Sequence, residues 1–168
     1  SGLYYVDKTE LLYDLVGETD HHVTLFTRPR RFGKTLGMSM MESFFDINRD
    51  SRALFEGLDI TKHEKFCASW MNQYPVLFIS FKDVDGLDFE NAYQMLAGTI
   101  VNLCIKFSFL EKELAVSSAD AVVFHRLMYK EADKEEIKDS LQTIMRMMSA
   151  VYGKPVILFI DEIHTLVG

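Results

Sequence analysis

The chain has 168 residues, and its 18 basic and 25 acidic side chains give a formal net charge of −7. With 48% hydrophobic residues, a chain of this length can build a core without disulfides or a structural metal, which excludes disordered and disulfide-stapled classes. The acidic balance argues against nucleic-acid binding through bulk charge, because phosphate contacts need concentrated Lys and Arg. The two cysteines lack a paired spacing, and no apolar stretch approaches the ~20 residues that span a bilayer. We therefore expect a cytoplasmic protein with no membrane partner.

Strand and helix patterns alternate along the first half of the chain. Short apolar runs predict buried strands, and apolar residues repeating every three or four positions predict helices. The predicted elements are a helix from Asp7 to Gly17, a strand at 23–26, a loop at 27–35, a helix ending at Phe45, an irregular connection at 48–61 and a helix at 66–74.

The second half continues this alternation. Its predicted elements are a strand at 76–81, a long helix at 89–107, a short helix at 123–128, a helix from Asp133 to Gly153 and a strand at 156–160. Three buried strands separated by helices predict an α/β layer fold with a mainly parallel sheet.

The loop at 27–35 carries the first functional motif. Gly33-Lys34-Thr35 follows a predicted strand and opens a predicted helix, which is the context of a phosphate-binding loop. Such a loop points backbone N–H groups and the positive end of the helix dipole at one spot. Gly33 allows close backbone approach, Lys34 can reach the β and γ phosphates, and the Thr35 hydroxyl can bind Mg²⁺.

A second motif lies at the end of the last predicted strand. Five apolar residues, 156–160, lead into Asp161-Glu162, which is a Walker B pattern. A buried strand would carry Asp161 to the carboxyl edge of the sheet, where it can hold the hydration shell of Mg²⁺. Glu162 would then orient and polarise the attacking water. A plainer alternative is that both acids cap a following helix. Composition puts the chance co-occurrence of the two motifs in this order at about one in twenty.

The residues from Arg28 to Thr35 resemble the loop of the bacterial and archaeal AAA-ATPase-like family, although Arg28 replaces the first glycine of the usual pattern. The resemblance extends over nearly the whole chain. Its other segments are Tyr5-Val6-Asp7-Lys8-Thr9, Phe44-Phe45-Asp46-Ile47, Leu54-Phe55-Glu56-Gly57-Leu58 and Tyr74-Pro75-Val76-Leu77. After Glu162 the chain departs from the family and is more similar to Clp-type unfoldases over residues 160–168.

The resemblance implies a P-loop NTPase-like three-layer sandwich, with residues 1–168 forming one domain from its N-terminal part through the Walker B strand. It implies ATP and Mg²⁺ as cofactors, with Lys34 and Thr35 in the loop and Asp161 and Glu162 in the strand. Thr35 and Asp161 would serve the metal, and Glu162 would be catalytic. Members of the family often carry a PD-(D/E)XK nuclease-like domain downstream. Because the chain begins with Ser1-Gly2 and not Met, and stops at Val167-Gly168 directly after an apolar segment, we expect it to be a piece of a longer protein.

The role of the arginines stays open. Arg30 and Arg31 could add positive charge to a triphosphate site, or they could contact acidic groups on a downstream domain, with about even odds. Arg28 is better explained as structural. A third, less favoured hypothesis is a DNA-associated domain that binds DNA through these cations. Apart from this, we expect nucleic-acid binding only through another domain of the intact protein.

Two functional hypotheses follow. The first is a P-loop domain that binds ATP and hydrolyses it with Mg²⁺ in the intact protein, weakly or not at all as this piece. The second is a nucleotide-dependent switch or interaction module with little or no hydrolysis. ATPases with a Glu after the Walker B Asp insert another strand beside the loop strand, so we expect an incomplete sheet with a gap at its centre and exposed edges that favour a homo-oligomer.

Overall fold

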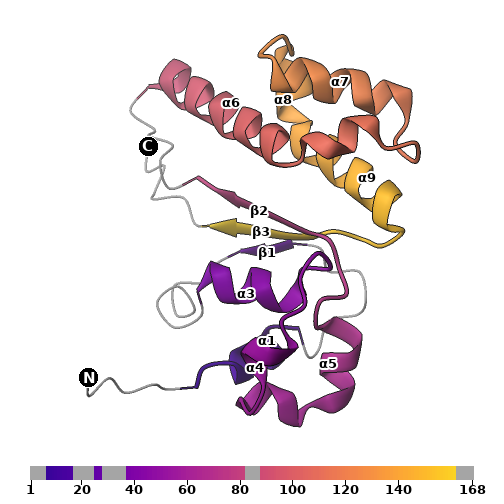
Figure 1. The fold of residues 1–168 in the computed structure, drawn as a ribbon. Helices are drawn as coiled ribbons and strands as arrows, with labels where there is room; N and C mark the ends of the chain where they lie inside the picture. Colours follow the sequence, from indigo (N-terminus) through magenta and orange to yellow (C-terminus); the bar gives the residue numbers. More distant parts are fainter. Residues whose placement is uncertain (1–6, 17–24, 28–36, 82–87, 162–168) are drawn as a thin grey trace.

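A parallel sheet lies at the centre of the computed structural model, which describes residues 7–16, 25–27, 37–81 and 88–161 (Figure 1). Its three described strands are β1 (Leu25–Thr27), β2 (Val76–Ser80) and β3 (Ile157–Asp161). Their order is β1-β3-β2, so β3 pairs in parallel with both neighbours. The predicted α/β class and the parallel sheet are therefore confirmed.

Alternate residues of the strands pack into two separate apolar clusters. Leu77, Ile79 and Leu158 belong to the α6-side cluster, with apolar residues of the helices α6 (Phe89–Lys106), α7 (Ser118–Met128) and α9 (Ser140–Tyr152). Ile157 and Phe159 belong to the α3-side cluster, with apolar residues of the helices α1 (Glu10–Val16), α3 (Met38–Phe45) and α5 (Glu64–Trp70). A strand buried on both faces needs apolar residues at every position, which explains the continuous apolar runs at 76–79 and 156–160.

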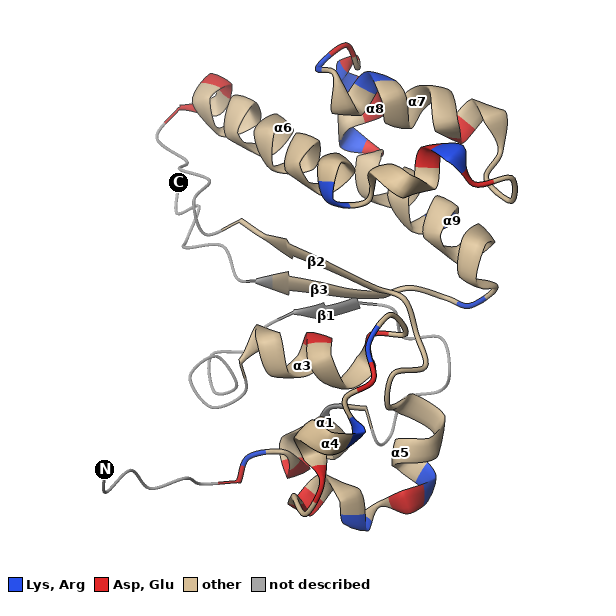
Figure 2. Cartoon of the chain, viewed as in Figure 1, with Lys and Arg blue, Asp and Glu red and all other residues tan. Residues whose placement is uncertain are grey.

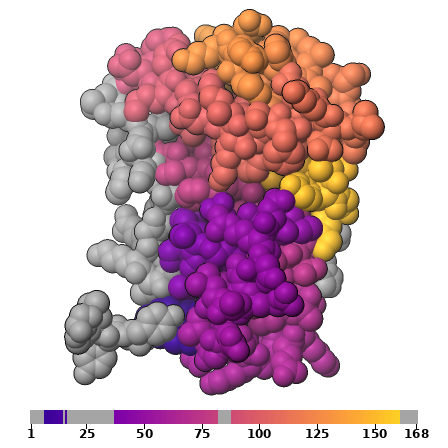
Figure 3. Space-filling model, in the orientation of Figure 1, coloured from indigo at the N-terminus to yellow at the C-terminus, as the bar shows by residue number. Residues whose placement is uncertain are grey.

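The helices form one layer on each face of the sheet, and Figure 3 shows the two layers as differently coloured regions of the surface. The α3-side layer contains α1 (Glu10–Val16), α3 (Met38–Phe45), α4 (Arg52–Phe55), the 3₁₀ helix η1 (Asp59–Lys62) and α5 (Glu64–Trp70). The α6-side layer contains α6 (Phe89–Lys106), the 3₁₀ helix η2 (Ser108–Lys112), α7 (Ser118–Met128), α8 (Lys134–Lys138) and α9 (Ser140–Tyr152).

The strand β2 carries no charged residue, and most of the charged residues lie on the helices and the connections between them (Figure 2). Along α6 they occur only at the ends, with Glu90 in the first turn and Lys106 in the last, as the helix dipole favours. Asp88 caps the first turn by accepting a hydrogen bond from the Glu90 N–H. Among the described residues, no helix combines the length and the apolar character needed to cross a membrane.

Two sequence expectations need correction. The predicted helix from Asp133 to Gly153 is two helices, because Asp139 breaks it between α8 and α9. Its ends are as predicted: Asp133 and Glu136 form a capping box, and Gly153 closes α9 at a φ of 66°, a conformation that glycine adopts without strain. The expected gap at the centre of the sheet is also not found, since Leu25, Phe26 and Thr27 pair directly with Leu158, Phe159 and Ile160.

The start of the described chain is fastened to η1 by a hydrogen-bonded clip. The fully buried Thr9 hydroxyl donates to Asp7 Oδ1 at 2.7 Å and accepts from the Ile60 N–H at 3.0 Å. Asp7 Oδ2 accepts from the Asp59 N–H at 2.7 Å. Partial desolvation raises the pKa of Asp7, but the bonds from Thr9 and Asp59 outweigh it and hold that pKa below its usual value.

We expect Thr9→Val to lower the free energy of unfolding by about 2 kcal/mol, because it leaves the Ile60 N–H and one bond of Asp7 unsatisfied without changing side-chain size much. The measurement is urea unfolding followed by circular dichroism. Thr99→Val on α6 is the matched control, since the Thr99 hydroxyl bonds only its own helix at Met95, and its loss should stay below about 0.5 kcal/mol. Equal effects at the two positions would contradict the role of the clip.

Candidate functional site

The carboxyl ends of the three strands meet at one edge of the sheet. Thr27 pairs with Ile160, and Ser80 pairs with Asp161, so all three strands end within one residue of one another. Open α/β sheets bind ligands in the crevice outside the carboxyl ends of their strands. This edge is therefore the candidate site that the fold itself indicates.

Strand alternation assigns the last positions of β2 and β3 to one face. Position 161 follows Ile157 and Phe159 in the α3-side set, and Ser80 follows Val76 and Phe78 in the same set. The register thus places Ser80 beside Asp161 at the carboxyl edge of the sheet.

The helix α3 begins at this same edge (Figure 1). Its N-cap residue is Gly37, whose backbone is extended and whose carbonyl accepts from the N–H groups of Met40 and Met41. No side chain of the described residues caps this end of the helix. Residues 28–36, which include most of the predicted phosphate loop, lie in the chain between β1 and Gly37 and are outside the described residues.

The structure describes one of the predicted site residues and leaves the others outside its described ranges. Asp161 is the last residue of β3, and the chain that follows it lies outside the described residues. The other predicted residues, namely Arg30, Arg31, Gly33, Lys34, Thr35 and Glu162, lie outside the described residues. The structure brings together the end of β1, the start of α3 and the end of β3, which are the elements next to these residues in the sequence.

Ser80 is a residue of this edge that the sequence did not single out. It is half-buried and closes the apolar run that forms β2. The signal that could have found it is its position as the polar residue at the end of a buried strand. Ser80 belongs to the candidate site because it pairs with Asp161, and this long-range pairing cannot be inferred from the local sequence pattern.

The far end of α3 is held by Asn72. Its side-chain NH₂ donates to the carbonyls of Ser43 and Asp46, at 2.9 Å each, and its Oδ1 accepts from the Ser51 N–H at 2.9 Å. Its backbone N–H donates to the Phe44 carbonyl, and its φ of 57° lies in the left-handed region that Asn tolerates better than most residues. These bonds fix where α3 ends relative to the start of β2.

The clearest pKa shifts among the described residues have structural causes. Hydrogen bonds from Arg52 lower the pKa of Asp50 to about 2, and burial raises the pKa of the Cys104 thiol to about 12. Asp50 lies on a surface turn beyond α3, and Cys104 lies in the α6-side cluster. Within the described ranges, no three His, Cys, Asp or Glu residues are grouped to hold a metal ion.

The geometry defines an α/β protein whose parallel sheet is covered by helices on both faces and whose candidate site lies at the carboxyl edge. The family model for AAA-ATPase-like proteins, described as predicted AAA-ATPases, matches residues 1–167, and the chain belongs to this family. The resemblance inferred from its sequence is thereby confirmed. No curated protein and no solved structure matches the chain.

We expect Asn72→Ala to lower the free energy of unfolding by about 3 kcal/mol, because it removes three side-chain hydrogen bonds and leaves a less tolerant residue at positive φ. Asn72→Gly removes the same hydrogen bonds, but glycine adopts a positive φ without strain. The decrease in the free energy of unfolding should therefore be smaller than in Asn72→Ala by roughly 1 kcal/mol. Urea unfolding of both variants measures the difference. Wild-type stability in Asn72→Ala would show that Asn72 does not anchor α3.

Proposed function

We propose that this chain is a P-loop NTPase domain that binds ATP with Mg²⁺ and hydrolyses it in the intact protein. The observation that carries the proposal is the meeting of three backbone ends at one sheet edge: the end of β1, the start of α3 and Asp161 at the end of β3. Membership of a family described as predicted AAA-ATPases supports the same activity. The two helical layers on a parallel sheet agree with a P-loop three-layer sandwich.

In this proposal, the loop between β1 and α3 binds the triphosphate. Gly33 lets the backbone approach the phosphates, and Lys34 neutralises the β and γ phosphates. The positive end of the α3 dipole faces the same edge, which favours an anion there. Arg30 and Arg31 extend from the same loop and would add positive charge to it.

The metal would be held by Thr35 and Asp161. A threonine hydroxyl and a carboxylate are oxygen donors, which suit Mg²⁺, and the last position of β3 carries Asp161 to the edge where the loop begins. When bound, Mg²⁺ neutralises charge on the phosphate oxygens. Ser80, paired with Asp161 and on the same face, would position that carboxylate or a neighbouring water.

Glu162 would act on the water that attacks the γ phosphate. It follows Asp161, the last residue of β3, in the sequence. Its carboxylate would accept a hydrogen bond from the water and hold the proton that the water loses, which is the task of a general base. Glu162 is therefore needed for ATP hydrolysis but not for ATP binding.

The alternative function is a nucleotide-dependent switch with little or no hydrolysis. One observation favours it: β1 pairs directly with β3, so within the described residues no further strand brings a polar side chain between the loop strand and Asp161. Binding needs the loop and the metal-holding residues alone, whereas hydrolysis also needs groups that stabilise the transition state.

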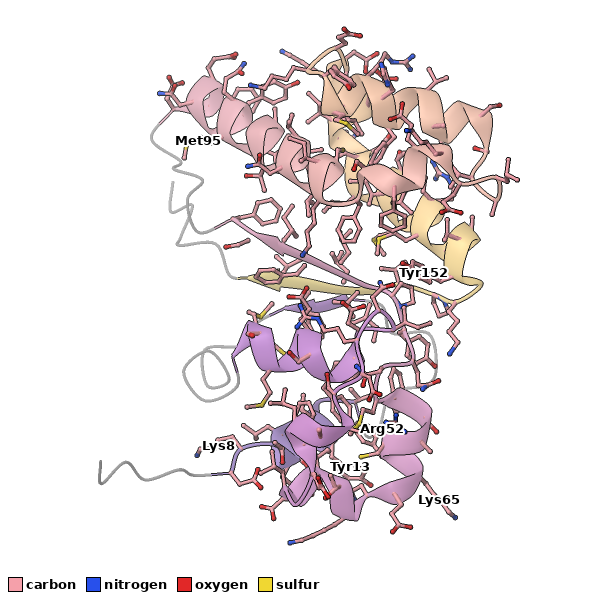
Figure 4. The ribbon with its side chains drawn as sticks, in the orientation of Figure 1. Lys8, Tyr13, Arg52, Lys65, Met95 and Tyr152 are labelled. Atoms are coloured by element: carbon pink, nitrogen blue, oxygen red, sulfur yellow. The ribbon has the colours of Figure 1, made fainter. Side chains whose placement is uncertain are left out.

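We expect MgATP to bind the chain, and Lys34→Ala to weaken binding by at least about a hundredfold, because it removes the cation nearest the β and γ phosphates. Isothermal titration calorimetry measures both affinities. Lys65→Ala is the control: Lys65 is exposed on α5, far from the carboxyl edge, and its removal should leave the affinity unchanged (Figure 4). Equal binding by the Lys34→Ala variant and the wild type would disprove the proposed loop.

Glu162→Gln separates the two functions. We expect this variant of the intact protein to keep its affinity for MgATP and to lose ATP hydrolysis by a factor of about 10² or more, because glutamine cannot accept the proton from water. Phosphate release under saturating ATP is the measurement, with calorimetry as the check on binding. Binding without turnover in both wild type and variant would support the switch instead.

A further inference from the structure

An open groove lies between α4 and α5, away from the candidate nucleotide site. Its volume is about 900 Å³, and it is lined by residues from Asp50 to Gly57 and from Thr61 to Gln73. Gln73 lies just before Pro75 and the start of β2, so the groove reaches toward the amino edge of the sheet. The phosphate loop begins at the opposite edge, where β1 ends.

The walls of the groove are acidic. Its lining includes the carboxylates of Asp50, Glu56 and Glu64 and one cation, Arg52, which lies on α4 (Figure 4). Arg52 is already paired with Asp50, through bonds of 2.9 Å from Nε and 2.7 Å from Nη2. Lys62 on η1 is paired with Asp59. Within the described residues, no ion pair joins Glu56 or Glu64, both exposed, to a cation; the exposed Lys65 follows Glu64 in the sequence and does not line the groove.

Apolar side chains also line the groove. We call four of them, Ala53, Cys67, Ala68 and Met71, its floor; the two alanines are exposed, and Cys67 is half-buried with its thiol donating to the Ile60 carbonyl. Small side chains leave room for backbone to approach, and Met adapts its shape to different apolar groups. The groove thus combines an apolar floor with two carboxylates on its walls that no described cation neutralises.

We propose that this groove is a docking site for a basic peptide segment of a partner protein, in which Arg or Lys side chains pair with Glu56 and Glu64 and small apolar side chains pack on the floor. Charge complementarity carries the proposal. Here two carboxylates lie on either side of an apolar floor. A peptide segment in which basic and small apolar residues alternate would match both features.

The shape of the groove favours a peptide over other basic or acidic ligands. Glu56, Glu64 and Ala68 are exposed, so a small molecule would keep much of its surface in water, whereas an extended segment makes contacts along the whole groove. Nucleic acid is excluded as the occupant because its phosphates would face the carboxylates of Glu56 and Glu64.

The test uses a short blocked peptide that alternates arginine and alanine, labelled for fluorescence anisotropy. We expect it to bind the wild-type chain and to bind the double variant Glu56→Gln/Glu64→Gln about fivefold to tenfold more weakly, because two charge pairs are lost. The control is Glu113→Gln/Glu131→Gln, which changes the net charge equally at exposed sites of the α6-side layer and should bind like wild type. Equal weakening in the two double variants would overturn the proposal, since it would reflect net charge alone.

Alkylation of Cys67 locates the bound peptide. We expect the peptide to slow the reaction of Cys67 with iodoacetamide severalfold, while the buried Cys104 stays unreactive throughout and serves as an internal reference. The same peptide with neutral citrulline in place of arginine should neither bind nor protect. Binding without protection of Cys67 would overturn the location. Spermine that binds as tightly as the peptide, with the same dependence on Glu56 and Glu64, would overturn the claim that the groove recognises a peptide.

Discussion

The parallel pairing of β3 with both of its neighbours is the constraint on which the rest of the described structure depends. A central strand has all its backbone groups bonded within the sheet, and both faces of β3 must then be covered by apolar side chains. Parallel neighbours also require a crossover between strands, which supplies the helices that cover those faces. The same crossovers bring the three strand ends, and the starts of α3 and α6, to one edge (Figure 1). The candidate site is a consequence of this topology.

The sequence predicted what depends on local pattern. Strands buried on both faces read as continuous apolar runs, so β2 and β3 were found almost to the residue, and the capping box at Asp133 was found because its signature is local. The break at Asp139 was missed because the apolar repeat runs on across it from Ile137 to Leu141. The pairing of β1 with β3 could not be predicted, since the choice of strand neighbour depends on contacts over more than a hundred residues. The motif at Lys34 and Asp161 was visible in sequence, but the partnership of Ser80 with Asp161 needed the register.

The two helical layers are joined mainly through the sheet. Beyond it, the described contacts between them are polar and lie around its margins: Lys106 Nζ to Glu42 Oε1 at 3.4 Å, and Tyr152 Oη to Asn48 Oδ1 at 2.9 Å (Figure 4). Lys154 Nζ adds a bond of 2.7 Å to the Gln73 carbonyl. Exposed ion pairs contribute little to stability, usually below about 1 kcal/mol. The apolar clusters on either face therefore account for most of the packing, and the polar contacts set the alignment of one layer against the other.

The candidate site and the α4–α5 groove select ligands of opposite charge, and α3 connects them. The helix begins at Gly37 on the carboxyl edge, and the chain after its last residue, Phe45, runs directly to Asp50 and Arg52 on the groove wall. A nucleotide at the first end and a basic segment at the second would not compete for the same side chains. An influence of one on the other that passes along α3 has to work against the bonds by which Asn72 holds the carbonyls of Ser43 and Asp46. Because packed helices move as units and not by continuous bending, those bonds decide whether the end of α3 moves with its beginning.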